Sequence, residues 1–445
     1  MPNSCYAALL SDCPFIQAPG NRSGLTVLDE YKGIPREARL LVYLSVPPGL
    51  AVGFIYTDLS YFLPNVQGLL PFWTGVTITT MGVTVATMCI PLGIVADRYG
   101  RRKMLILGNL CAGTSLLGFA LTRSLPLILL TAVVEGLGEA SFAVSFNALL
   151  ADRAGDEKRT ASFSLGALLS WISGATGAFA ISSVVLIEKL GLSVGQAHVV
   201  LYIAVALISL SITPLILRVH ETKIPAPGQR RSILPRKSSK VIIRYTVYSL
   251  AIALGAGLFV PLMTYWFSAA YGIPDTLSGP LLGVSSILTA LAVLLAPRLA
   301  KRLGHVKAIV TTQALSTFFM VAVPLSPTFA IAVSLYTVRV FLMNLSNPLG
   351  QSLLMGLVSP DERGMASGVT AALWRLPNSL STTVGYVLIG DHLLGLPFYI
   401  ATVFYVFSIT AFWFMFKNAR LPEEAVSPAQ VLAQSSSLEG SEEIR

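Results

Sequence analysis

Five ionisable residues lie inside long apolar stretches of this chain, where a charge is costly. They are Asp58, Glu135, Glu139, Arg339 and Arg375. A charged side chain costs about 2.5–3.5 kcal/mol to insert at the centre of a membrane helix, so such residues normally face a cavity or a partner. Three acids and two arginines in apolar surroundings can bind a substrate, carry protons or lock helices together. We expect a functional role for these five, with purely structural pairing as the alternative.

A second group of charges interrupts the apolar sequence between residues 93 and 103. The stretch "GIVADRYGRRK" carries one acid and four basic residues, and it lies between "PFWTGVTITTMGVTVATMCIPL" and "MLILGNLCAGTSLLGFALT". A soluble protein could not leave either flanking segment exposed to water. The charges therefore indicate a short loop between two membrane-spanning segments.

The composition is that of an integral membrane protein. Of the 445 residues, 54% are hydrophobic and 12% are charged, which is about half the charge content of a soluble chain. Largely apolar runs of about 20 residues recur, each long enough to cross a bilayer as a helix. The short alternating segments of a membrane β-barrel are missing from the sequence. We expect an all-α membrane protein.

The net charge of +9 reflects topology and not nucleic-acid binding. All but four of the 31 Lys and Arg residues fall on one side of the expected helices; Arg123 and Lys189 fall on the other side, and Arg339 and Arg375 within spans. Basic residues concentrate in cytoplasmic loops, so we expect both termini in the cytoplasm of a plasma-membrane protein, with lipid headgroups as contacts.

Hydropathy and turn residues predict twelve spans. They cover residues 40–63, 71–96, 104–122, 126–150, 160–187, 198–217, 241–267, 279–299, 308–325, 328–357, 365–389 and 395–416. A basic, Pro-containing cytoplasmic linker, 218–240, separates two six-helix halves of nearly equal length, 40–217 and 241–416. We expect a cytoplasmic N-terminal tail over 1–39 and a polar, disordered cytoplasmic tail over 417–445.

The two halves repeat one another. "DEKRTASFSLGAL" from Asp156 matches "DERGMASGVTAAL" from Asp361 at an offset of 205, and "GIVADRYGRRK" falls on "PRLAKRLGHVK" from Pro297 at an offset of 204. The second copy has Lys301 where the first has Asp97. Parallel six-helix repeats are typical of one large class of secondary transporters, with the substrate site between the halves.

"GIVADRYGRRK" resembles the loop signature G-x-L-A-D-R-x-G-R-R-K of the major facilitator superfamily, with Val95 in place of Leu. The resemblance implies a latch that holds the cytoplasmic side closed. In it, Asp97 would contact the start of the eleventh helix, where unpaired N–H groups favour an anion. Arg101 would pair with an acid that ends the fourth helix. The latch residues are Gly93, Asp97, Arg98, Gly100, Arg101, Arg102 and Asp152.

The fourth span contains "EGLGEASF", Glu135–Phe142, which is similar to the G-x-G-E-A-S-Y of spinster-like lipid transporters and, more loosely, to a pattern of proton-linked drug exporters. Ala132 stands where both patterns have Arg, and Glu135 replaces a Gln of the exporter pattern. The resemblance makes Glu139 the foremost candidate to carry a proton. Asp58, nearer the outer end of the first span, is the second candidate. A carboxyl group in an apolar cavity can titrate near neutral pH.

Glu135 and Arg339 are related by the repeat offset and carry opposite charges. The resemblance implies that the fourth and tenth helices, which carry them, line the central cavity. We therefore predict that the two side chains pair across it in at least one state, because an unpaired charge at that depth is expensive.

No enzyme motif or ATP-binding loop is present, and the four cysteines and four histidines show no disulfide or metal-ligand spacing. We expect neither enzyme activity nor a cofactor or metal. The leading interpretation is a monomeric secondary transporter that exports small organic or amphipathic compounds by alternating access, driven by a proton gradient. The alternatives are a uniporter or importer of organic anions, and a membrane receptor that binds ligand without moving it.

Overall fold

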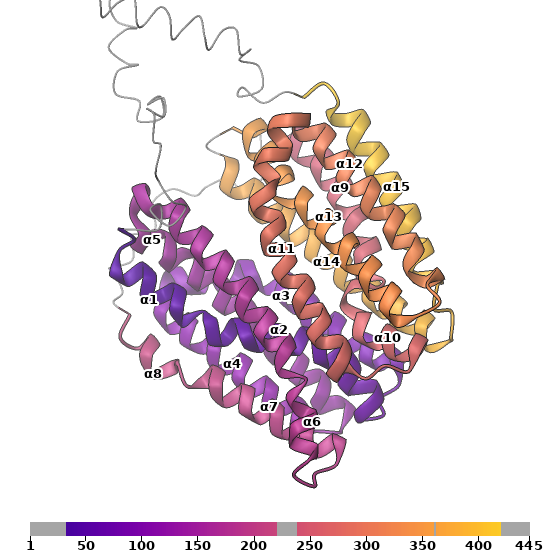
Figure 1. Ribbon diagram of the computed structural model, residues 1–445. Coiled ribbons are helices and arrows are strands. Elements are labelled where there is room, and N and C mark those ends of the chain that lie inside the picture. Colours follow the sequence, from indigo (N-terminus) through magenta and orange to yellow (C-terminus); the bar gives the residue numbers. More distant parts are fainter. Residues whose placement is uncertain (1–32, 220–237, 360–361, 420–445) are drawn as a thin grey trace, which may run out of the picture.

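The computed structural model describes residues 33–219, 238–359 and 362–419, and within these ranges it contains helices and turns but no strand. The chain forms two helical bundles that lie side by side and diverge toward the top of Figure 1. The first bundle contains α1 to α8 and the second contains α9 to α15. An all-α membrane fold is therefore confirmed.

The first bundle is built from the helices α1 Arg36–Leu44, α2 Val46–Tyr61, the π-helix η2 Phe62–Val66, α3 Pro71–Tyr99, α4 Arg101–Leu121, α5 Leu125–Ala180, α6 Ser183–Glu188, α7 Val194–Leu210 and α8 Thr213–Ile216. α5 provides two membrane spans. The first is Leu125–Ala154, and the second, Ala161–Glu188, begins in α5 and ends in α6. The chain folds back between them, since Gly166 lies against the side chains of Leu150 and Phe146.

The second bundle is built from the helices α9 Ser239–Gly257, the 3₁₀-helix η3 Val260–Leu262, α10 Met263–Tyr271, α11 Asp275–Leu303, α12 His305–Ala322, η4 Val323–Leu325, α13 Phe329–Leu357, α14 Arg363–Gly390 and α15 Leu396–Phe416. The seventh span comprises α9, η3 and α10, and it is broken at Pro261, which lacks the N–H that a continuous helix needs.

Eleven helical segments among the described residues are long and apolar enough to cross a membrane. The remaining expected span corresponds to α14, whose 28 residues would extend about 42 Å and which carries Arg375. Several helix boundaries differ from the sequence prediction by a few residues. The first helix begins at Arg36, ahead of residue 40, and α11 begins at Asp275, one turn before residue 279.

The repeat is visible in the secondary structure. α3 and α11 each have 29 residues and begin 204 positions apart, at Pro71 and Asp275. Each ends at a glycine with positive φ, 109° at Gly100 and 78° at Gly304, and the next helix starts at once. A side chain is strained at such φ values, so glycine at both positions permits the same tight connection between helices.

We call the end of the bundles that carries Gly100 and Gly304 the basic side, and the end that carries Gly68 and Gly272 the far side. The contacts between the halves that hold the far side together are direct. Ser60 on α2 hydrogen-bonds Thr264 on α10, and these two residues are themselves 204 positions apart. Thr79 on α3 donates to the Ser379 carbonyl of α14 at 2.6 Å.

Gly53 permits a close approach between helices in the first bundle. A Cβ placed on Gly53 of α2 would lie 2.1 Å from the Gly174 carbonyl oxygen of α5, a backbone atom that cannot rotate away. We expect Gly53→Ala to lower the free energy of unfolding by about 1–3 kcal/mol, since overpacking forces the helices apart. Thermal unfolding in detergent measures the effect. Gly195→Ala is the matched control, because its Cβ would make only an ordinary 3.6 Å contact with Val66; equal melting temperatures for the two variants would contradict the expectation.

Candidate functional site

A cavity of about 780 Å³ lies between the two bundles. Its wall is rich in tyrosines and side-chain amides, and it includes two of the five intramembrane charges, Arg339 and Arg375. Besides these, the wall contains Tyr56, Tyr245, Tyr248, Tyr336, Tyr405, Gln313, Asn344, Asn347, Gln351, Asn378, Thr370, Trp171 and Trp374. The cavity is thus aromatic and hydrogen-bonding, with positive charge in its wall, which suits a small organic molecule with polar groups.

An ion pair joins the two halves near the middle of the membrane. Arg375 of α14 donates to both carboxylate oxygens of Glu139 on α5, at 2.6 and 2.7 Å. Tyr56 of α2 donates to the same carboxylate at 2.7 Å and accepts a hydrogen bond from Arg375 at 2.5 Å. The side chains of Arg375 and Glu139 remain 28% and 18% exposed, and Arg375 and Tyr56 lie in the cavity wall.

Arg339 of α13 is more deeply buried than Arg375. It is buried, with one Nη donating to the Tyr405 hydroxyl of α15 at 2.6 Å and the guanidinium carbon 4.8 Å from the centre of the Phe259 ring. Its Nε has no hydrogen-bond partner. Within the described parts of the chain, no carboxylate lies within 4.0 Å of it.

The predicted pair of Glu135 and Arg339 is not formed in this structure. Glu135 is buried and accepts a hydrogen bond from Ser115 of α4, inside the first bundle. Arg339 turns into the second bundle, toward Tyr405. Each residue makes its side-chain hydrogen bond within its own half, so the two do not pair in this conformation. Their pairing in another state stays a prediction, and the pair between the halves here is Glu139 with Arg375.

The structure brings together three residues that sequence reasoning left apart. Asp58, named above, lies beside His198 of α7 and Asp275 at the start of α11. The histidine showed no ligand spacing along the sequence, and Asp275 was missed because its span was expected to begin at residue 279. Asp275 follows "YGIP" and precedes an apolar run. An acid in that position is typical of a helix N-terminus, and this signal could have predicted that α11 begins there.

The residues of the loop signature lie together on the basic side. Arg101 at the start of α4 pairs with Asp152 of α5 at 2.5 Å. Arg102 donates to the carbonyl oxygens of Leu217 and Val219 at 3.2 and 3.4 Å. A Cβ added to Gly93 would lie 3.4 Å from a side-chain carbon of Val144, an ordinary contact distance. Arg98 is exposed. The side chain of Asp97 and residues 360–361 lie outside the described set, so its contact with the eleventh span stays a prediction.

Comparison with known proteins identifies the family. The chain matches the family model of the Major Facilitator Superfamily over residues 48–382, and a second match covers residues 245–439. It belongs to the major facilitator superfamily. The protein is therefore a multi-pass membrane transporter of small molecules and not an enzyme. No curated protein sequence is detectably similar to it.

Solved structures share the fold at low sequence identity. The nucleoside transporter NupG matches with a TM-score of 0.69 and 17% identity over 86% of this chain and 99% of its own. A bacterial homologue of the human lysosomal transporter Spinster, in an inward-facing and unoccupied conformation, matches with a TM-score of 0.71 and 12% identity over 88% of this chain and 98% of its own.

Proposed function

We propose that this protein is a proton-coupled secondary transporter of small organic anions, with Arg339 as the group that binds the anionic end of the substrate. The observation that carries the proposal is the buried guanidinium of Arg339 in the cavity wall, which has no carboxylate partner among the residues that the structure describes. The basic side would face the cytoplasm of a plasma membrane. No part of the proposal requires an oligomer.

A buried cation without a counter-charge is costly, and a ligand that supplies the anion removes the cost. Tyr405 occupies one Nη of Arg339 and leaves Nε without a partner. A guanidinium can bind a carboxylate or phosphate through two parallel hydrogen bonds. The N–H groups of Arg339 that do not donate to Tyr405 can therefore donate to an oxyanion. The tyrosines around it would contact the organic part of the substrate.

Glu139 is the proposed site of proton coupling. In this conformation both of its oxygens accept hydrogen bonds, from Arg375 and Tyr56. A proton bound to this carboxylate would remove the negative partner of Arg375 and weaken the bond between the halves. Proton binding and opening of the transporter would thereby be linked, as alternating access requires.

A second candidate is proton-driven export of small amphipathic compounds. The observation in its favour is the spinster-like "GEAS" sequence that contains Glu139, together with the fold shared with the Spinster homologue. In that case the substrate would be neutral or cationic, and Arg339 would serve only to hold Tyr405 and Phe259 in place.

A ligand screen by thermal shift separates the two candidates. A ligand that binds only the folded protein stabilises it by about 2.7 kcal/mol at a hundred times its dissociation constant. We expect small aromatic carboxylates or phosphates to raise the melting temperature of the purified protein, and their neutral amides or esters not to. Stabilisation by the neutral or cationic compounds alone would favour the second candidate and contradict the first.

The loop signature supports the latch proposal and yields a prediction of its own. We expect Asp97→Asn to leave folding intact, to shift the population toward conformations open on the basic side and to depress transport, because an anion at a helix N-terminus contributes about 0.3–1 kcal/mol. Lys301→Gln, at the corresponding position of the second half, is the matched control. Substrate flux in proteoliposomes measures both variants, and equal losses would rule out an asymmetric latch.

A further inference from the structure

We infer that Asp58, His198 and Asp275 form a proton-binding site that spans the two halves and keeps the far side closed when it is protonated. Asp58 lies on α2 and His198 on α7, in the first bundle, whereas Asp275 is the first residue of α11, in the second. All three side chains are at most 1% exposed. The site is separate from the cavity, whose wall contains none of them.

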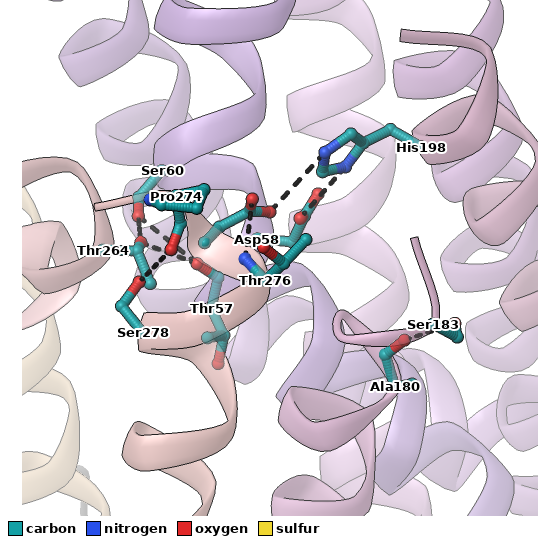
Figure 2. A network of polar contacts seen from close by, with 11 residues as sticks. Thr57, Asp58, Ser60, Ala180, Ser183, His198, Thr264, Pro274, Thr276 and Ser278 are labelled. Carbon is teal, nitrogen blue, oxygen red and sulfur yellow. Dashed lines mark hydrogen bonds and ion pairs between the residues drawn. The ribbon is translucent and has the colours of Figure 1, made fainter. Parts of the chain in front are cut away.

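The histidine ring lies between the two carboxyl groups. Its Nδ1 is 3.3 Å from Asp58 Oδ1, and its Nε2 is 3.7 Å from Asp275 Oδ2. Figure 2 shows His198 directed toward Asp58, with Thr276 beside the cluster. Asp275 is fixed by the Thr276 backbone N–H, which donates to its Oδ1 at 2.9 Å.

The buried polar atoms of this cluster indicate shared protons. Apart from the two contacts to the histidine ring, the described residues offer no hydrogen-bond partner to either oxygen of Asp58, to the ring nitrogens of His198 or to Oδ2 of Asp275. Buried polar atoms in native proteins are almost always hydrogen-bonded. With its second ring nitrogen protonated, the imidazole donates toward both acids, and one further proton can be shared between the carboxyl groups.

Apolar and aromatic groups surround the cluster and supply no compensating cation. The ring centroids of Tyr61 and Phe62 lie 6.4 and 5.6 Å from that of His198. Tyr202 of α7 places a buried hydroxyl near Asp58, and the acid Glu188 at the end of α6 lies near Tyr61. Within the described residues, no Lys or Arg pairs with Asp58 or Asp275.

The charges of the cluster and the orientation of the histidine ring favour bound protons over a metal ion. An imidazolium with two carboxylates has a net charge of −1, and one added proton makes it neutral, which is the least costly state in an apolar interior. A metal ion binds through one nitrogen of a histidine ring. Here each nitrogen faces a different carboxyl group. This arrangement suits two N–H donors better than a metal ligand.

The site links protonation to the position of the two halves. Opening the far side would move Asp275 away from Asp58 and His198 and admit water to all three. Without the shared proton, the closed state would hold two carboxylates among atoms that lie within 4.8 Å of one another, and like charges at that distance repel. The inference rests on the proposed transport only in requiring that the far side can open.

The distance between the halves on the far side tests this inference without any substrate. Spin labels at Leu190 and Leu325, both exposed, report it by electron–electron double resonance after Cys5, Cys13, Cys89 and Cys111 are replaced by serine. We expect the closed-to-open ratio of the otherwise unchanged chain to fall by at least about tenfold from mildly acidic to mildly alkaline pH, the change that 1.4 kcal/mol produces.

Two variants and one control make the test specific. Asp275→Asn mimics a protonated acid and should stay closed over the whole pH range. His198→Gln leaves two acids without a cation and should open at lower pH than the parent chain. Asp391→Asn removes an exposed acid on the same side of the membrane and should follow the parent chain.

Three results would overturn the inference: a pH-independent distance in the parent chain, the same pH dependence in Asp275→Asn as in the parent, or opening at acidic pH on addition of a chelator. The last result would indicate a metal site instead. Because no substrate is added, none of these results depends on whether the chain transports anions.

Discussion

Replacing either Glu139 or Arg375 by glutamine is expected to lower the free energy of unfolding by about 2–5 kcal/mol, whereas replacing both should cost less than the sum. Each single change leaves one charge without its partner inside the membrane, and this uncompensated charge is the main cost. Arg375 donates to both carboxylate oxygens at 2.6 and 2.7 Å, so the two charges act as a unit. Both single variants should also lose most of their transport.

A double-mutant cycle measures this coupling. Thermal unfolding of the parent, Glu139→Gln, Arg375→Gln and the double variant in the same detergent gives the interaction energy, which we expect to exceed about 1 kcal/mol. Tyr56→Phe is the control for the hydroxyl alone, and we expect a smaller loss from it, since it removes no charge. Strictly additive losses would show that the pair contributes nothing to stability, and the account of how the halves are joined would be wrong.

Arg339→Gln is expected to weaken the binding of an anionic substrate by roughly 10- to 150-fold, the effect of losing hydrogen bonds from a charged group worth about 1.5–3 kcal/mol. Arg339→Lys should give an intermediate loss, since lysine keeps the charge but cannot present two parallel donors. Tyr405→Phe is the positioning control, because it removes the hydroxyl that accepts from Arg339 at 2.6 Å without removing the cation.

Isothermal titration with the best organic acid from the thermal-shift screen measures these affinities. The neutral analogue of the same acid serves as a second control, and its weak binding should not change between the parent and Arg339→Gln. Equal affinity of the acid for the parent and for Arg339→Gln would remove Arg339 from the substrate site and favour the second candidate function.

The fold was predictable because its signals are local. The helices follow from apolar runs of about the length that a bilayer requires. The repeat follows from an offset that both sequence and secondary structure share, as the glycines Gly100 and Gly304 show. The errors lie at helix ends. Asp275 was placed in a loop because polar residues beside it resemble a turn, although it begins the helix α11.

The partners of the charged residues were not predictable from the repeat. The offset relates Glu135 to Arg339, but symmetry-related positions need not face each other. Glu135 turns toward Ser115 and Arg339 toward Tyr405, each inside its own bundle. Which acid meets which arginine depends on the rotation of α5 and α14 about their axes, and only the packing of whole bundles fixes it.

Uptake of a labelled organic acid into proteoliposomes, with and without a proton gradient, tests the central claim most directly. The account predicts accumulation that depends on the gradient, is abolished by a protonophore and is lost in Arg339→Gln, while Asp391→Asn transports as the parent does. Binding of the acid to purified protein without any flux in proteoliposomes would contradict the claim, since it would indicate a receptor that holds its ligand and does not move it.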